Sequence, residues 1–112
     1  MPRKFHRKKG PRRSFLKNLM HNIIMQGGIA TTETRAKEAR SVLEPLVTLA
    51  KKQGVADLRL VMSRLPHKSS AYKLFHEIAP RYANRTGGYM RIVKQGAVRK
   101  RDGVALARVE FV

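Results

Sequence analysis

The chain has 112 residues with 42% hydrophobic side chains, enough for one small packed domain, and this excludes wholesale disorder. Its 25 Lys and Arg outnumber its 7 Asp and Glu, giving a formal net charge of +18. Repulsion among these cations opposes folding unless a polyanion neutralises them, so nucleic acid is the first expected partner and an anionic membrane the second. The lack of cysteine excludes disulfides and thiolate metal sites.

Residues 1–13, MPRKFHRKKGPRR, are predicted to form a basic arm that orders on a phosphate-rich partner, with residues 14–112 as a single domain. The alternative is a merely solvated tail. This segment lacks the hydrophobic region of a signal peptide, and Gly10 and Pro11 interrupt any presequence helix. No apolar run is long enough to span a membrane, so we expect a soluble, cytoplasmic protein. The arm cations expected to contact RNA are Arg3, Lys4, Arg7, Lys8, Lys9, Arg12 and Arg13.

Two helices are predicted in the first half of the chain, separated by a short strand at Ile29–Thr32. The first is predicted because apolar residues recur at i, i+4 and i+8 up to about Gln26. Ser14 is expected to cap this helix, and Gly27-Gly28 to end it. The second runs from about Glu33 to Lys52, and Gly54 closes it. Pro45 inside this helix removes a backbone hydrogen bond and is expected to bend or break it. Cations of these helices predicted to contact RNA are Lys17, Arg35 and Lys37.

Two more helices are predicted before residue 80. The third spans Val55–Arg64, with an apolar side formed by Val55, Leu58, Met62 and Leu65. The fourth is capped by Ser69 or Ser70 and ends near Ala79, because the residue before a proline avoids the helical region. Its buried stripe is predicted to comprise Ala71, Leu74, Phe75 and Ile78.

The stretch Phe75–Lys94, FHEIAPRYANRTGGYMRIVK, is predicted to form the principal RNA-facing surface. Arginine offers a planar fork of donors to phosphate oxygens, and both Arg and Tyr stack on bases. Two adjacent glycines allow positive φ and a close approach of the backbone to a ligand. The residues expected on this surface are Arg81, Tyr82, Asn84, Arg85, Gly87, Gly88, Tyr89 and Arg91.

The side-chain alternation of a strand places Tyr89 and Arg91 on one face and Met90 and Ile92 on the other. We expect Met90 and Ile92 to face the helices, and Tyr89 and Arg91 to turn away from them toward RNA. The alternative is that the two tyrosines of this stretch are half-buried core residues and the arginines only confer solubility.

A C-terminal hairpin is predicted, in which Tyr89–Gln95 pairs with Val104–Val112 across the loop GAVRKRDG. Its basic tip, Arg99, Lys100 and Arg101, is a second expected RNA contact, with an ordinary polar turn as the alternative. The order helix, strand, three helices and two strands predicts a two-layer α+β fold. Its small, mostly antiparallel sheet is covered on one face by helices, which leaves the other for RNA or a neighbouring protein.

The sequence contains no recognisable set of catalytic residues. The histidines at positions 6, 21, 67 and 76 have no ligand-like spacing, and neither glycine pair continues into a phosphate-binding loop. The carboxylates are too few and dispersed for a general acid/base pair. We therefore expect no catalytic activity, no metal, no cofactor and no small-molecule substrate.

Several short blocks together carry a resemblance to a known family. The most specific block comprises Leu74-Phe75, Glu77, Pro80-Arg81-Tyr82, Arg85, Gly87-Gly88-Tyr89 and Arg91-Ile92. Others are Arg3-Lys4, Arg7, Asn18-Leu19, Thr31-Thr32, Ala36-Lys37-Glu38, Glu44-Pro45-Leu46, Leu49-Ala50-Lys51, Ala107 and Glu110. In this order and spacing, over nearly the whole chain, they resemble the family of bacterial large ribosomal subunit protein seventeen.

The resemblance implies a structural protein of the large ribosomal subunit, bound to 23S ribosomal RNA and to neighbouring proteins near the peptide exit tunnel. Where the family usually carries Ser-Ser-His after its first basic cluster, this chain has Lys8-Lys9-Gly10-Pro11, so that segment's contacts are not carried over. Two other functions stay open from the residues alone. A nucleoid-type DNA-binding protein predicts a symmetric dimer without preference for RNA, and an RNA-modifying or RNA-cleaving enzyme needs a reactive constellation.

Overall fold

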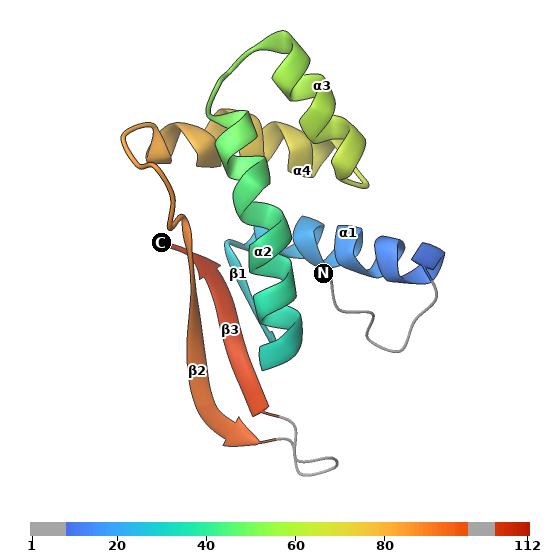
Figure 1. Cartoon of the computed structure of the whole chain (residues 1–112), viewed down its shortest axis with the longest axis vertical. Coiled ribbons are helices and arrows are strands. Elements are labelled where there is room, and N and C mark those ends of the chain that lie inside the picture. The colour runs from blue at the N-terminus through green and yellow to red at the C-terminus, as the bar shows by residue number, and fades with distance from the viewer. Residues whose placement is uncertain (1–8, 99–104) are drawn as a thin grey trace.

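A computed structural model describes the backbone of residues 9–98 and 105–112 and the side chains of residues 14–95 and 105–112. The element order in the described chain confirms the predicted α+β fold (Figure 1). The elements are α1 (Lys9–Gln26), β1 (Gly28–Thr32), α2 (Glu33–Ala50), α3 (Val55–Arg64), α4 (Lys68–Lys73), β2 (Met90–Val98) and β3 (Ala105–Phe111). Helix α4 continues directly into a π-helical turn, Leu74–Ile78, and a 3₁₀ turn, Ala79–Tyr82.

The described strands form one antiparallel sheet in the order β1-β3-β2. Val109 of β3 pairs with Ile29 and with Ile92, so these three side chains share the face on which α2 packs. Glu110 pairs with Gly28 and Arg91 on the opposite face. Figure 1 shows α2 running along one face of the sheet, with α1, α3 and α4 gathered toward one end. The two-layer arrangement is therefore as predicted.

The core lies where α1, α2 and the α4 segment meet the sheet. Side chains that are fully buried there include Ile23, Ile24, Leu43, Leu46, Val47, Leu74 and Val109. Each contributes roughly 1.5–3 kcal/mol of transfer free energy. The stripe predicted for the fourth helix is buried, as expected. The third helix differs, because Val55 is 70% exposed and Val61, which the prediction passed over, is fully buried.

Helix α1 begins before its predicted cap. It starts at Lys9, five positions ahead of Ser14. Pro11 therefore falls in the first turn, where a missing N–H costs nothing because no helical carbonyl precedes it. The predicted end is confirmed: Gly27 follows Gln26 with φ +82°, and its N–H donates to the Ile23 carbonyl at 2.8 Å.

Helix α2 continues through Pro45 to Ala50, so of the two predicted alternatives, a bend or a break, the break does not occur. The helix ends two residues before Lys52. The left-handed residue beyond it is Gln53, with φ 60°, in place of the predicted Gly54. The amide Nε2 of Gln53 donates to the carbonyls of Ala50 and Phe75, each at 2.8 Å, which stabilises this conformation.

The fourth helix is capped at His67, not at Ser69 or Ser70. Ser70 is buried within the helix, where its hydroxyl donates to the His67 carbonyl at 3.0 Å. Pro80 does not end the helical path at Ala79, because it stands at the start of the 3₁₀ turn that extends to Tyr82. Helical carbonyls precede Pro80, and the Phe75 carbonyl, which an N–H at residue 80 would reach in the π-helical pattern, accepts instead from Gln53 Nε2 at 2.8 Å.

The hairpin of β2 and β3 pairs as predicted, but β2 is longer than expected. It begins at Met90 and includes residues 96–98, which the sequence pattern places in the loop, and its register shifts between Lys94 and Val98. The basic tip at residues 99–101 lies outside the described residues. Among the helices of the described chain, none combines the length and apolar character needed to cross a bilayer.

Candidate nucleic-acid interface

Loop 83–89, from Ala83 to Tyr89, connects the 3₁₀ turn to β2 beside the C-terminal end of α2 (Figure 1). Gly88 takes φ +63°, a conformation that L-residues with a side chain rarely adopt. Arg85 closes the loop on itself, with Nη1 donating to the Gly88 carbonyl at 3.1 Å. Gly87 has open space where a Cβ would stand. The loop therefore presents an exposed backbone turn with an arginine held across it.

Two side chains of α2, Glu44 and Thr48, and that of its C-cap residue Lys51 anchor this loop. They lie one helical turn apart and so share a side of the helix. Lys51 Nζ donates to the Tyr89 hydroxyl at 2.9 Å and to the Arg85 carbonyl, and Thr48 Oγ donates to the same hydroxyl at 3.3 Å.

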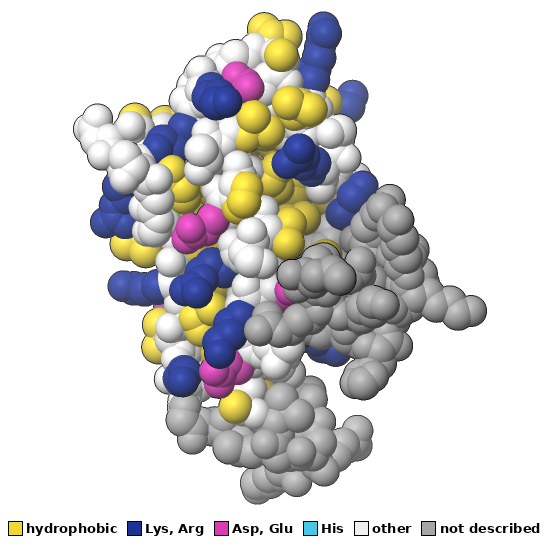
Figure 2. Space-filling view, viewed as in Figure 1, with side chains coloured by type: hydrophobic (Ala, Val, Ile, Leu, Met, Phe, Trp, Pro, Cys, Tyr) yellow, Lys and Arg dark blue, Asp and Glu magenta, His cyan; other side chains and the backbone are white. Residues whose placement is uncertain are grey.

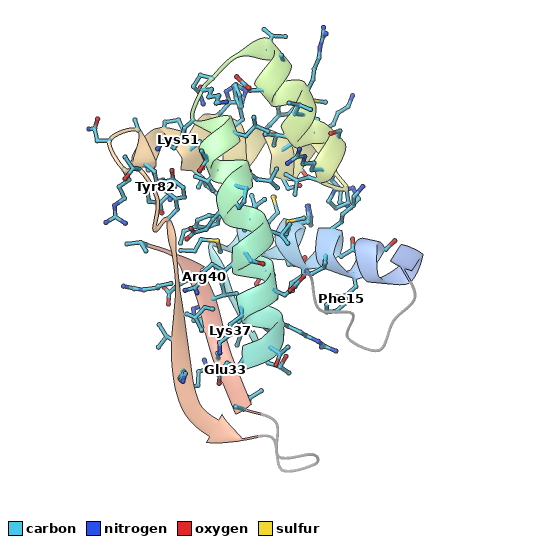
Figure 3. All side chains as sticks on the ribbon, viewed as in Figure 1. Phe15, Glu33, Lys37, Arg40, Lys51 and Tyr82 are labelled. Carbon is cyan, nitrogen blue, oxygen red and sulfur yellow. The ribbon has the colours of Figure 1, made fainter. Side chains whose placement is uncertain are left out.

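The anchoring extends to both ends of the loop. The Met90 N–H donates to Glu44 Oε1 at 3.3 Å, where β2 begins. At the other end, the Arg85 N–H donates to the Tyr82 carbonyl at 2.9 Å. Lys51 and Tyr82 are labelled at this end of α2 in Figure 3. The loop is thus held at both ends by hydrogen bonds.

The two tyrosines of the predicted RNA surface are core residues. Tyr82 is 4% exposed and Tyr89 is 1% exposed, and their ring centroids lie 5.4 Å apart. The predicted outward orientation of Tyr89 is wrong, because this residue precedes the strand and its hydroxyl turns to Lys51 and Thr48. The Tyr82 hydroxyl donates to the Val112 carbonyl at 2.6 Å. Burial of the two rings leaves no face on which a base could stack.

The electrostatics of the tyrosines follow their surroundings. The hydrogen bond from Lys51, followed by that from Thr48, lowers the pKa of Tyr89 below its ordinary value. Burial raises the pKa of Tyr82, against the smaller opposing effect of Arg81 and Arg85. The Lys51 ammonium also lies 4.9 Å from the centre of the Tyr89 ring. The Lys51 ammonium therefore interacts with groups of the protein itself, the Arg85 carbonyl and Tyr89.

The arginines of the loop region are exposed, as predicted. Within residues 14–95 and 105–112, neither Arg81 nor Arg85 has an ion-pair partner. Arg81 lines a hollow of about 180 Å³ together with Lys73 and Val112. Asn84, Gly87 and Gly88 are exposed beside them. This is a cationic surface whose charge the described carboxylates do not neutralise.

The arginines of the sheet, exposed Arg91 and half-buried Arg108, are paired. Arg91 Nη2 lies 3.4 Å from Glu110 Oε2, and Arg108 Nε lies 3.7 Å from Glu110 Oε1. Val93, 44% exposed, is on the same face as Arg91. Met90 is buried and Ile92 is half-buried on the helix side, as predicted. Exposed side chains thus give the open face both apolar and charged character.

The remaining predicted contacts are spread over the molecule. Lys37 pairs with Glu33 at 3.0 Å. This contact, followed by the charge of Lys94, lowers the pKa of the Glu33 carboxyl. Arg35 places its guanidinium 4.8 Å from the centre of the Phe15 ring, and Lys17 is half-buried on α1. The side chains of Arg3, Lys4, Arg7, Lys8, Lys9, Arg12, Arg13, Arg99, Lys100 and Arg101 lie outside the described residues.

Sequence reasoning missed Lys51 and Arg108. Lys51 is 38 residues from Tyr89, so no local sequence pattern links the two residues. Figure 2 shows Lys and Arg spread over one face, with few Asp or Glu among them. The described residues contain no cluster of His, Asp or Glu that could hold a metal ion. The excess of cations on this face suits electrostatic binding of a polyanion.

A comparison with protein families identifies a match over most of the chain. The family model described as Ribosomal protein L17 matches residues 15–112. The match includes loop 83–89, its anchor on α2 and the whole sheet.

Proposed function

Because the chain belongs to the ribosomal protein L17 family and is a constituent of the large ribosomal subunit in the cytoplasm, we propose that it binds and stabilises folded 23S ribosomal RNA. In this role loop 83–89, with Arg81 and Arg85, meets phosphate oxygens. The family is one of structural ribosomal proteins, not of enzymes. The protein then stabilises the folded RNA by placing fixed positive charges against its phosphates.

The arrangement of loop 83–89 is the observation that carries this proposal. Arg81 and Arg85 are exposed without a described ion-pair partner, while Lys51 holds the Arg85 carbonyl within the loop and Glu44 holds the start of β2. A fixed loop loses little conformational entropy when it binds, so more of the contact energy appears as affinity. The Arg85 guanidinium has further N–H groups beyond the one bonded to Gly88.

The neighbours of the protein follow from the same assignment. We place it beside other large-subunit proteins on the side of the peptide exit tunnel, with the open face of the sheet as the surface available to them. A nucleoid-type DNA-binding function has no specific observation in its favour. Competition between ribosomal RNA and duplex DNA separates the two, because only the ribosomal function predicts preference for the folded RNA.

Salt titration tests the electrostatic account. If the protein neutralises ~6–10 phosphates, its affinity for ribosomal RNA falls on the order of 10³-fold or more between 50 and 200 mM salt. Retention on large subunits through a high-salt wash tests the assignment in the assembled particle. An affinity that is nearly independent of salt across this range would contradict the proposal.

The arm is proposed to add RNA affinity without adding stability. Because α1 begins at Lys9, the informative deletion removes residues 2–8 and leaves the helix intact. We expect weaker RNA binding at an unchanged melting temperature of the free protein. A large fall in melting temperature without RNA would show that these residues pack on the core.

A further inference from the structure

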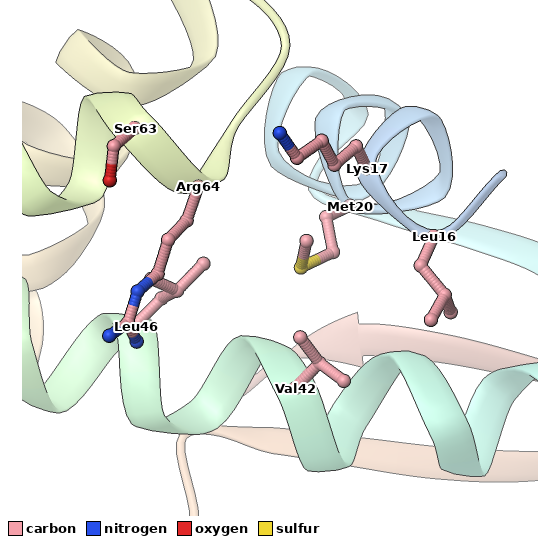
Figure 4. A pocket seen from close by; sticks show the side chains of 7 residues that line it. All are labelled: Leu16, Lys17, Met20, Val42, Leu46, Ser63 and Arg64. Atoms are coloured by element: carbon pink, nitrogen blue, oxygen red, sulfur yellow. The ribbon is translucent and has the colours of Figure 1, made fainter. Parts of the chain in front are cut away.

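A cleft of about 320 Å³ opens between helices α1, α2 and α3, away from loop 83–89 (Figure 4). Its walls are apolar and are formed by Leu16 and Met20 of α1 and by Val42 and Leu46 of α2. Lys17 and Arg64 stand at its sides, and Figure 4 shows the Arg64 side chain reaching from α3 toward Leu46. The volume falls at the lower end of the range for small-ligand pockets.

Both charged side chains of the cleft, Lys17 and Arg64, are cationic. Neither Lys17 nor Arg64 has an ion-pair partner within residues 14–95 and 105–112, and the lining contains no carboxylate. Ser63 also lines the cleft, and its hydroxyl donates to the Leu60 carbonyl at 2.7 Å. The lone pairs of that oxygen therefore stay available to accept a hydrogen bond. An occupant that fits has a flat apolar body, an N–H group and adjoining negative charge.

We propose that this cleft holds one unstacked nucleobase from a single-stranded segment of the RNA, with Lys17 and Arg64 meeting the phosphates on either side. The proposal rests on the RNA-binding function and adds a second, base-holding site to it. Bases splayed out of single strands bind by burying their faces against side chains, and the guanidinium plane of arginine is one of the surfaces on which they stack. A base buried here gains apolar contact with Leu16, Met20 and Val42.

Charge complementarity selects RNA over a neighbouring protein side chain. An apolar side chain of another protein would fill the walls equally well, but it would leave both cations at the edge without partners. A nucleotide supplies the apolar body and the anions together. The rest of the chain, with 25 Lys and Arg against 7 Asp and Glu, attracts the same polyanion.

The test compares a single-stranded uridine octamer with an abasic octamer of equal charge. We expect the unmodified protein to bind the uridine strand about fivefold or more tightly, since stacking of a base contributes about 1–3 kcal/mol. Val42→Phe fills the cleft from its half-buried wall and should remove this preference. Arg64→Gln should reduce it, whereas Arg59→Gln, an exposed arginine of the same helix that does not line the cleft, should leave it unchanged.

A second measurement avoids substitution. Ribosomal RNA containing 4-thiouridine is crosslinked to the unmodified protein, and the attached peptides are identified by mass spectrometry. Crosslinks on residues 16–20 or 42–46 support the proposal. Equal binding of the two octamers, together with crosslinks confined to loop 83–89, overturns the base site and leaves the RNA-binding function standing.

Two other outcomes separate the remaining alternatives. Failure to bind ribosomal RNA at all contradicts the proposed function itself. If Val42→Phe keeps full RNA affinity and crosslinking but no longer enters large subunits, the cleft holds a neighbouring protein and the nucleobase assignment is wrong. Circular dichroism melting of each variant confirms that the compared proteins are folded.

Discussion

The surface formed by Arg81 and loop 83–89 and the open face of the sheet both carry arginines, but the two regions use that charge differently. Arg81 and Arg85 have no ion-pair partner in the described chain, while Arg91 and Arg108 share Glu110 at 3.4 and 3.7 Å. The surface pairs are individually weak, about 0–1 kcal/mol. They nevertheless compete with any phosphate for the same donors. Equal numbers of arginines in the sequence therefore do not mean equal availability for RNA.

Removal of the lysine under the loop should have the largest effect. Lys51→Met deletes two hydrogen bonds and a ring contact, and we expect it to cost about 1–3 kcal/mol of folding stability. RNA affinity should fall as well, although Lys51 itself is not proposed to touch RNA, because the loop loses its support. Thermal melting and RNA titration measure the two losses.

The adjacent Lys52 is the matched control for this variant. It is exposed and has no bond to the loop, so Lys52→Met removes the same charge without disturbing the anchor. If both variants weaken RNA binding equally and neither lowers the melting temperature, Lys51 is only another surface cation and the anchoring role is wrong.

The two arginine surfaces should separate in a direct comparison. Arg85→Ala should cost about 1–3 kcal/mol of RNA binding, as expected for a charge-assisted contact. Arg91→Ala should cost less, because Glu110 already occupies its guanidinium. In a Glu110→Gln background the cost of Arg91→Ala should rise, and a double-mutant cycle on RNA affinity measures that increase.

A contrary result would locate the error. If Arg91→Ala unfolds the free protein while RNA affinity per folded molecule stays the same, the pair with Glu110 is structural and the open face is not RNA-facing. If Arg91→Ala weakens RNA binding more than Arg85→Ala does, the sheet is the principal surface and the loop is secondary.

The glycines of the loop offer a smaller and more local test. Gly88→Ala places a Cβ at φ +63° and should cost about 1–2 kcal/mol of stability, since that conformation disfavours side chains. Gly87→Ala should be nearly neutral because a Cβ there meets nothing within 4 Å. Chemical denaturation measures both. A cost at Gly87 equal to that at Gly88 would show that the loop adopts another conformation in solution.

The smallest effect is expected at His21, away from both regions. Its Nδ1 is buried without a hydrogen-bond partner in the described chain, and its ring lies 4.7 Å from that of His67. Burial, with a smaller contribution from His67, lowers the pKa of His21 below 6.5. The unfolded chain thus binds more protons just below pH 6.5, and folding stability should fall as the pH is lowered through that range.

Melting at pH 7.5 and pH 5.5 measures this dependence in the free protein. His21→Gln should flatten it, whereas His76→Gln, at an exposed histidine, should not. A pH dependence that survives His21→Gln unchanged would assign the titration to other groups. The low pKa of Glu33 acts at more acidic pH and does not confuse the comparison.

The fold was largely predictable from the sequence, because apolar periodicity reports which side of each element is buried. The stripe from Ala71 to Ile78 and the alternation of Ala107 and Val109 are examples. The site was less predictable. Tyrosine carries both an apolar ring and a polar hydroxyl, so Tyr82 and Tyr89 suited a core and an RNA surface equally.

Long-range contacts place the two tyrosines in the core. Their hydroxyls bond to Lys51, Thr48 and Val112, which are 38, 41 and 30 residues away. No local pattern encodes such contacts. The proline boundaries failed for two different reasons. Pro11 lies in the first turn of α1, which has no use for the missing N–H. Pro80 follows a helical turn, but Gln53 Nε2 donates to the Phe75 carbonyl that would otherwise lack a partner.

The strand order also fixes when the sheet forms during synthesis. In the described sheet β3 lies between β1 and β2, although it follows both in the chain. The two earlier strands therefore leave the ribosome without a pairing partner, and their ladders form only after β3 has emerged. Tyr82 and Tyr89 likewise wait for Val112, to which both are hydrogen-bonded. The helices α1, α2 and α3 precede this step, so the RNA-facing loop acquires its final shape after most of the helical layer has been made.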